Sequence, residues 1–361
     1  MHVHRCTALF VCLFPLLALC CGRVGGPTDS AQPAGGTNNA IDLAGYFDNT
    51  GYDDMLAGGV RMIPIKTDSG DFHVWTKRIG NNPRIKVLLL HGGPGMTHEY
   101  LEAFDSYFPG AGIQYYYYDQ LGSSYSDQPK NDSLWTVSRF VDEVEHVRQA
   151  LGLDQDDFYL YGHSWGGILA LEYALKYQQH LKGLIVSNMM ASIPAYNEYA
   201  RKVLMPQMNQ EALAQIQILE REHKTDDPRY MELLMPNFYM QHILRMPGDE
   251  WPDPVMRAMK HVNEHIYELM QGPSEMGASG RLADWDRSRD LPSIAVPTLT
   301  IGARYGTMDP DYMEWMARQV QKGQFLFCPD GSHLDMYDDQ QVYMQGIIQF
   351  IENVDSDAGH P

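Results

Sequence analysis

Short apolar runs alternate with amphipathic helical patterns from about residue 45 onward. The continuous apolar run at 85–90 is typical of a strand buried on both faces. Apolar positions at helical spacing cover 137–151 and stop at Gly152, as expected for a helix. Further strands are expected at 60–66, 72–78, 115–118, 158–161, 184–186, 298–301 and 324–327. Further helices are expected at 168–177, 310–321 and 340–353. This repetition predicts an α/β fold with a mostly parallel central sheet and right-handed crossovers.

The alternation breaks in the middle of the chain. Residues 191–289 are helical in pattern and rich in methionine, with no convincing strand. An all-helical insertion within an α/β sheet predicts a cap domain over an active site. The core is then formed by 45–190 together with 290–361.

The N-terminal sequence predicts export. Residues 8–19 are almost wholly apolar, yet this run is too short to span a bilayer, so 1–21 are expected to be a signal peptide. The end of this run is similar to a bacterial lipoprotein signal, with Cys20 or Cys21 as the lipidated residue. Residues 22–44 are expected to be a flexible linker. The expected location is the periplasm, or the membrane surface through a lipid anchor.

Composition excludes some partners and crosslinks. The formal net charge is −19 and no long basic run occurs, which argues against nucleic-acid binding. Four of the five cysteines lie in the first 21 residues, which leaves Cys328 and excludes an internal disulfide framework.

The strongest chemical motif is Gly162-His163-Ser164-Trp165-Gly166, between a predicted strand and a predicted helix. This context is that of a nucleophile elbow, in which a tight turn projects the serine hydroxyl above the sheet edge. The hydroxyl then lies at a helix N-terminus, where negative charge is favoured. The motif predicts Ser164 as a nucleophile.

A serine nucleophile needs a base, and in this fold the acid and then the histidine follow the serine. His333 is the expected base, because it lies after the last strand and before the closing helix. Asp309 is the expected acid, since it lies on a loop at the carboxyl end of a predicted strand. Asp311, Asp330 and Asp335 are the alternatives for the acid.

Acyl transfer also needs preorganised donors for the oxyanion. The glycine-rich turn 91–95 directly follows a predicted strand. We expect the backbone N–H groups of Gly93 and Trp165 to form the oxyanion hole. His91 and His163 flank the chemistry and are interpreted as structural residues.

Together these residues resemble the proline iminopeptidases, a family of α/β-hydrolase serine peptidases. The likeness extends over about 60–353, and its motifs are 91–95, 118–123, 126–129, 270–275 and 284–286. Of these, His-Gly-Gly-Pro-Gly at 91–95 is far more specific than the serine motif.

The resemblance implies how the substrate is recognised. Cap glutamates of the family bind the free α-amine of the first residue, and Glu275 matches one of them. Glu232 is the nearest match to the second. The resemblance further implies release of N-terminal residues, preferentially proline, from short peptides with a free N-terminus, through an acyl-enzyme and without a metal or organic cofactor.

Other functions share parts of this pattern. An esterase, lactonase or N-acyl amide hydrolase would use the same catalytic residues, because they do not define the leaving group. His261-Val-Asn-Glu-His265 matches the H-x-x-E-H zinc-protease pattern, although no further acidic ligand is evident. Haloalkane dehalogenases and epoxide hydrolases are disfavoured, because they carry Asp where Ser164 stands. A non-catalytic surface-anchored binding protein is disfavoured while all the catalytic partners are present.

Overall fold

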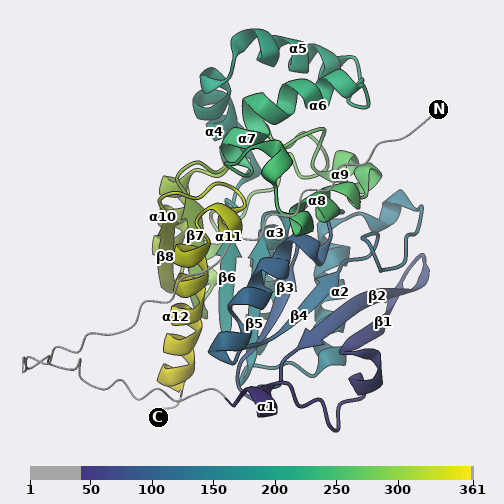
Figure 1. The fold of residues 1–361 in the computed structure, drawn as a ribbon, viewed down its shortest axis with the longest axis vertical. Helices are drawn as coiled ribbons and strands as arrows, with labels where there is room; N and C mark the ends of the chain where they lie inside the picture. Colours follow the sequence, from purple (N-terminus) through teal and green to yellow (C-terminus); the bar gives the residue numbers. More distant parts are fainter. Residues whose placement is uncertain (1–41, 359–361) are drawn as a thin grey trace, which may run out of the picture. The chain divides into compact units, whose positions relative to one another are not determined.

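The computed structural model describes residues 42–358 of the chain (Figure 1). The predicted signal peptide lies outside these residues, as does nearly all of the predicted linker. The first described helix, α1 (Leu43–Tyr46), begins before the predicted end of that linker. Within residues 42–358, no helix has both the length and the apolar character needed to cross a membrane.

A central eight-stranded sheet has the order β1-β2-β4-β3-β5-β6-β7-β8. Its strands are β1 (Val60–Thr67), β2 (Gly70–Ile79), β3 (Lys86–Leu90), β4 (Gln114–Asp119), β5 (Phe158–His163), β6 (Gly183–Ser187), β7 (Pro297–Ala303) and β8 (Lys322–Cys328). β1, β2 and β4 pair antiparallel, and every other pairing is parallel. The predicted fold class, an α/β-hydrolase fold with a mostly parallel sheet, is confirmed.

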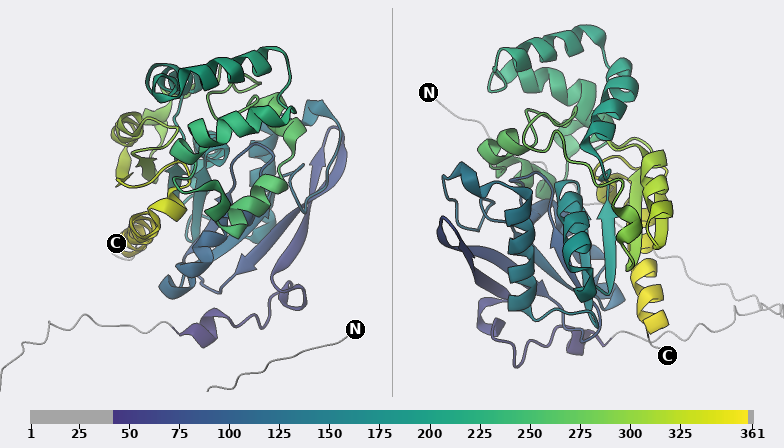
Figure 2. Two further views of the ribbon diagram at one scale, coloured as in Figure 1. Left: turned by 45° about the horizontal axis from the view of Figure 1, so that its top comes forward. Right: turned by 180° about the vertical axis from the view of Figure 1, so that it is seen from behind.

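Helices cover both faces of the sheet, so its central strands are buried on both sides (Figures 1 and 2). One apolar core includes α2 (Val137–Leu151), α3 (Trp165–Tyr177) and α10 (Pro310–Gln319). The other includes the 3-10 segment η2 (His98–Ser106) and α12 (Gln340–Ala358). All residues of β5 and β6 are buried, which explains their continuous apolar sequences.

The bounds of α2 show how local sequence sets an element. The Thr136 side chain accepts a hydrogen bond from Arg139 N at 3.4 Å and caps the helix start. Gly152 ends the helix in the left-handed conformation, with φ of 65°, where a glycine has no Cβ penalty. The predicted helix at 137–151 therefore has the observed bounds.

The segment 191–289 is inserted between β6 and β7 and carries short helices. They are α4 (Ile193–Tyr199), α5 (Gln210–Arg221), α6 (Pro228–Leu234), α7 (Met240–His242), α8 (Asp253–Lys260) and α9 (Glu264–Met270). A single bridge, Ser192 to Asp286, closes its base. These helices lie over the carboxyl ends of the parallel strands (Figures 1 and 2), so the cap covers the edge where the catalytic loops meet.

Candidate active site

Ser164 occupies a strained turn between β5 and α3. Its φ of 55° and ψ of −125° lie in a region that side chains other than glycine rarely adopt. A Cβ on Gly162 would lie 2.1 Å from Gly166 O, and one on Gly166 would lie 2.3 Å from Leu90 O. The two glycines are therefore required by close packing, and the predicted elbow is the observed turn.

The oxyanion loop passes directly beside the serine. A Cβ on Gly92 would lie 3.1 Å from the Cβ of Ser164. Gly93 has a φ of 113° and lines the same cavity as Ser164. Trp165 is the first residue of α3, where a backbone N–H has no acceptor within the helix. Gly93 and Trp165, the two residues expected to donate, thus lie close to Ser164, and their role as donors stays a prediction.

Gln120 ties the oxyanion loop to the start of α3. Its Nε2 donates to His91 O at 3.0 Å, and its Oε1 accepts from Trp165 Nε1 at 2.8 Å. Its backbone N–H donates to His91 Nε2 at 3.1 Å. Burial lowers the pKa of His91 to about 4, so its ring is neutral. His91 therefore serves the structure, as predicted.

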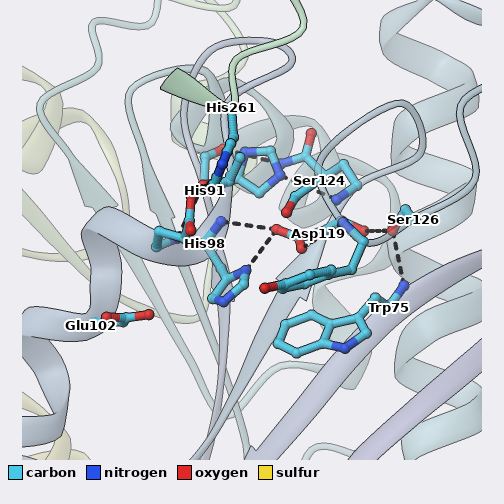
Figure 3. A network of polar contacts seen from close by, with 12 residues as sticks. Trp75, His91, His98, Glu102, Asp119, Ser124, Ser126 and His261 are labelled. Carbon is cyan, nitrogen blue, oxygen red and sulfur yellow. Dashed lines mark hydrogen bonds and ion pairs between the residues drawn. The ribbon is translucent and has the colours of Figure 1, made fainter. Parts of the chain in front are cut away.

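Asp119, at the end of β4, holds the segment that follows the loop. Its Oδ1 accepts from the backbone N of His98 at 2.9 Å and pairs with Nδ1 of the same residue at 2.8 Å (Figure 3). The same figure shows Ser126 joining β4 to Trp75. The Ser126 hydroxyl donates to Asp119 O, and it accepts from the backbone N–H of Trp75 at 2.9 Å. The sequences 118–123 and 126–129, which carried part of the family resemblance, thus form a scaffold beneath the oxyanion loop.

His333 lies in the cavity with Ser164 and is almost fully buried. Its backbone N–H donates to His242 O at 2.9 Å, which fixes the loop against α7. Burial, together with the nearby ring of His163, lowers the pKa of His333 well below its ordinary value. The imidazole is therefore neutral at pH 7 and can accept a proton.

The structure does not join Asp309 to His333, which corrects the expected role of Asp309. Asp309 is the N-cap of α10, and its Oδ1 accepts from the backbone N of Asp311 at 3.0 Å. This capping role follows from its position one residue before the helix. The Nδ1 of His333 lies instead 2.9 Å from the hydroxyl of Thr307.

The three alternative acids do not pair with the His333 ring either. Asp311, on α10, and Asp330 are both exposed. Asp335 is fully buried, and burial raises its pKa well above its ordinary value. Within residues 42–358, the only hydrogen-bond partner of the imidazole Nδ1 is therefore neutral.

A cavity of about 400 Å³ opens between the cap and these loops. Its walls are mainly apolar and aromatic, and none of its lining residues is Lys or Arg. The aromatic and apolar members include Met96, Tyr100, Tyr230, Met231, Tyr239, Ile243, Val255, Met259, Tyr267 and Leu334. Such a pocket suits a small ligand with an apolar side chain.

Glu275 lies in this cavity without a cationic partner. Its Oε1 accepts from Tyr267 OH at 2.5 Å, and Tyr196 OH holds its backbone carbonyl at 2.5 Å. Burial raises the pKa of Glu275 to about 7, because the charged carboxylate is poorly solvated. The site thus holds an acid that a bound cation would ionise.

Glu232 does not reach the cavity. It is exposed on α6, whereas its neighbour Met231 lines the cavity wall. Sequence reasoning missed Glu264 and Glu268, two acids of α9 that do line it. Their spacing of four residues, which places both on one helix face, was the signal that could have identified them.

The H-x-x-E-H pattern does not form a zinc-protease helix. His261 follows the end of α8 and contacts Glu99 Oε2 at 2.8 Å, while Glu264 begins α9. His265 contacts Asp132 Oδ1 at 2.8 Å, on another loop. The pattern is split between two helices, and no group of three or more metal-ligating side chains occurs within the described residues.

Comparison with known proteins places this geometry in a family. The model of the alpha/beta hydrolase fold family matches residues 86–340. The chain is therefore an α/β-hydrolase, as its sheet and nucleophile turn indicate.

Closer relatives narrow the assignment within this fold. The proline iminopeptidase of Flavobacterium johnsoniae is 61% identical over 82% of this chain and 99% of its own length. That of Chitinophaga pinensis is 55% identical over 83% of this chain and all of its own. The chain belongs to the proline iminopeptidase family, and it is a hydrolase of the prolyl aminopeptidase type.

Solved structures agree with this assignment. The crystal structure of VinJ superposes with a TM-score of 0.75 at 28% identity, over 81% of this chain and 99% of that one. The proline iminopeptidase of Mycobacterium smegmatis superposes with a TM-score of 0.71 at 26% identity, over 83% of this chain and 99% of that one.

Proposed function

We propose that the protein is a serine aminopeptidase that releases N-terminal residues, preferentially proline, from short peptides. The observation that carries this proposal is Glu275, a carboxylic acid in the cavity of Ser164 that has no Lys or Arg beside it. A substrate ammonium would supply the missing charge through a charge-assisted hydrogen bond. A blocked N-terminus could not do so.

The proposed chemistry is covalent acyl transfer. Ser164 Oγ attacks the carbonyl carbon of the first residue while His333 Nε2 takes the hydroxyl proton. The N–H groups of Gly93 and Trp165 stabilise the oxyanion, and the proton then passes to the departing amine. Water, deprotonated by His333, attacks the ester and frees the amino acid and the serine.

The shape of the cavity supports the preference for proline. Its walls carry methionines and tyrosines, and its volume of about 400 Å³ is at the small end of ligand pockets. A pyrrolidine ring is compact and apolar, so it can be buried against these side chains without unpaired polar atoms. Flexible methionines also suit other small apolar residues.

The test is a panel of arylamides of Pro, Ala, Leu and Lys, with N-acetyl-Pro-arylamide and a simple aryl ester, assayed with wild type and Ser164→Ala. We expect Pro-arylamide to give the highest kcat/KM. Blocking the amine should lower kcat/KM by about 10²-fold, the value of a charged hydrogen bond. Ser164→Ala should lose nearly all turnover.

Two outcomes of this panel would contradict the proposal. Faster turnover of the blocked amide or of the ester would favour the alternative activities, an esterase, lactonase or N-acyl amide hydrolase. Full turnover by Ser164→Ala would remove the serine mechanism.

Export and lipid attachment stay proposals from the N-terminal sequence. Labelling of the bacterial protein with a radioactive fatty acid tests them, with Cys20→Ser, Cys21→Ser and the double variant as controls. We expect label in the membrane fraction for wild type and none for the double variant. Unlabelled soluble wild-type protein in the cytoplasm would contradict both export and lipidation.

A further inference from the structure

The loop between β7 and α10 brings a hydroxyl, and not an acid, to the ring of the general base. Thr307 is fully buried, and its Oγ1 lies 2.9 Å from His333 Nδ1. The acids nearest to these two residues in sequence have other surroundings: Asp309 caps α10, and the buried carboxyl of Asp335 makes no hydrogen bond to the His333 ring. We propose that Thr307 is the residue that positions His333, so that this enzyme operates a Ser-His-Thr arrangement without a carboxylate. This inference rests on the proposed serine mechanism.

A hydroxyl can perform one of the two tasks of the usual acid. When Thr307 Oγ1 accepts a hydrogen bond from Nδ1–H, the tautomer of His333 is fixed and the lone pair of Nε2 is free for the serine proton. A neutral hydroxyl adds no negative charge, however, so it stabilises the imidazolium of the transition state less than a carboxylate would. Catalysis at neutral pH should therefore be limited by the basicity of His333.

The other groups that pack around His333 do not supply this charge. The Nε2 of His163, at the end of β5, donates to His333 O at 2.8 Å, and its pKa is lowered to about 4 by burial. His242, on α7, offers its backbone carbonyl to His333 N. The Asn188 amide after β6 donates to His333 O at 3.3 Å. Asp335 and Asp338 lie on the short helix α11 (Asp335–Asp338), and neither bonds the imidazole: Asp338 accepts from the backbone N of Ser332 at 2.9 Å and of Arg245 at 3.1 Å, and the Asp335 carboxyl oxygens have no hydrogen-bond partner within the described residues.

Gly306 offers a position from which a carboxylate could be added. Its φ is outside the left-handed region, so a side chain causes no backbone strain there. A Cβ at this position would make only ordinary contacts, the nearest being Ala303 O at 3.5 Å, and it would lie 3.6 Å from His333 N. Gly306→Asp therefore adds an acid next to the backbone of His333, one residue before Thr307.

The first experiment compares Thr307→Val, Thr307→Ser and Thr300→Val. Thr300 is a matched control, because its buried hydroxyl also makes one hydrogen bond, to Met313 O at 2.9 Å. This bond joins β7 to α10, the two elements that the Thr307 loop connects. We expect Thr307→Val to lower kcat for Pro-arylamide about 10- to 100-fold, the size of an acid–base contribution lost in part. Thr307→Ser should retain activity within about threefold, since it keeps the hydroxyl. Equal losses in Thr307→Val and Thr300→Val would overturn the inference.

A second readout does not depend on the peptide substrate. A fluorophosphonate forms an O–P bond with Ser164, expels fluoride and transfers the serine proton to His333. We expect Thr307→Val to slow this labelling by the same factor as turnover. If wild type labels rapidly but does not cleave Pro-arylamide, the aminopeptidase proposal fails while the role of Thr307 is still tested.

The third variant adds the missing charge. Gly306→Asp should raise kcat/KM at pH 7 about tenfold or more, because an acid beside the imidazole stabilises the imidazolium. It should also move the acid limb of the pH profile upward by about one to three pH units. A profile unchanged by Gly306→Asp, together with a loss of about 10⁴-fold in Asp309→Asn, would overturn the inference and restore Asp309 as the acid.

Discussion

The ring of His163 donates a hydrogen bond from Nε2 to the backbone carbonyl of His333 at 2.8 Å. Its Nδ1 lies 3.0 Å from Tyr100 OH, which itself accepts from Gly92 N at 2.7 Å. Because a carbonyl can only accept, Nε2 must carry the proton and Nδ1 must accept from the tyrosine. One chain of hydrogen bonds thus connects the oxyanion loop to the loop of the general base.

Breaking this chain at its centre should affect both loops. His163→Phe leaves the His333 carbonyl and the Tyr100 hydroxyl unsatisfied in a buried site. We expect the free energy of unfolding to fall by about 1–3 kcal/mol and kcat to fall about tenfold, because the catalytic groups lose alignment. Urea denaturation and Pro-arylamide kinetics measure the two effects. Unchanged kcat in a destabilised variant would show that the chain supports folding alone.

Gln120 should matter for kcat more than for KM. Gln120→Met keeps the side-chain length but removes both hydrogen bonds, to His91 O and from Trp165 Nε1. The donors of the oxyanion hole would be held less rigidly, so kcat should fall about tenfold while KM stays within about twofold. Steady-state kinetics with Pro-arylamide tests this. A change confined to KM would place Gln120 in substrate binding instead.

Glu275→Gln should separate substrates with and without a free amine. The variant keeps the size of the side chain and the contact with Tyr267 but cannot become negative. We expect kcat/KM for Pro-arylamide to fall about 10²-fold, and that for an aryl ester without an amine to change by less than about threefold. Equal losses on both substrates would leave Glu275 without a role in amine recognition.

The raised pKa of Glu275, about 7, predicts a pH dependence of binding. Below pH 7 the acid is protonated in the free enzyme, so KM for free-amine substrates should rise as pH falls from 8 to 6. The ester substrate should show no such rise, and Glu275→Gln should abolish it. Initial rates over this range measure the effect.

The raised pKa of Glu275 affects folding stability in the opposite direction to substrate binding: a rise in pH favours binding but lowers stability. A carboxyl whose pKa is higher folded than unfolded binds its proton more tightly when folded, so its stabilising effect is present below about pH 4.5 and is lost as pH rises to about 7. Glu275→Gln should therefore raise Tm more at pH 8 than at pH 5. A larger increase at pH 5 would contradict the raised pKa.

Arg257 fastens the cap to the core and should control access to the site. It pairs with Glu99 at 2.9 Å and with Glu102 at 2.5 Å, both on η2, from its place on α8. The guanidinium is one-third exposed, so Arg257→Met should cost only about 1 kcal/mol of stability. We expect KM for Pro-arylamide to rise and its dependence on salt to vanish, since wild type loses the same ion pairs at high ionic strength. A salt dependence of KM that persists in the variant would show that the ion pairs of Arg257 do not control access to the site.

Sequence patterns predicted the framework well where one physical rule acts alone. The strands and α2 follow from apolar periodicity and capping, and the turn at Ser164 follows from two glycines that have no room for a Cβ. The cavity position of Glu275 came from the family resemblance, since nothing in its local sequence distinguishes a cavity acid from a solvated one.

The partner of His333 could not be found in this way. An aspartate before a helix has two roles, a cap or a catalytic acid, and both fit Asp309 by spacing alone. Which role it takes depends on the path of a loop packed against a residue 24 positions later in the chain. Nothing in the sequence around Thr307 distinguishes it from other threonines, so its contact with His333 could be identified only from the structure. Glu232 was wrongly expected at the cavity for a related reason: its neighbour on α6, Met231, lines the cavity wall instead, and the sequence does not fix which of the two faces inward.

The insertion of the cap between β6 and β7 places the nucleophile and the base on opposite sides of about a hundred residues. During synthesis the serine leaves the ribosome long before the loops that carry Thr307 and His333. The chain therefore stays chemically inert until its last strand has docked, and a truncated or half-made copy cannot digest the peptides around it.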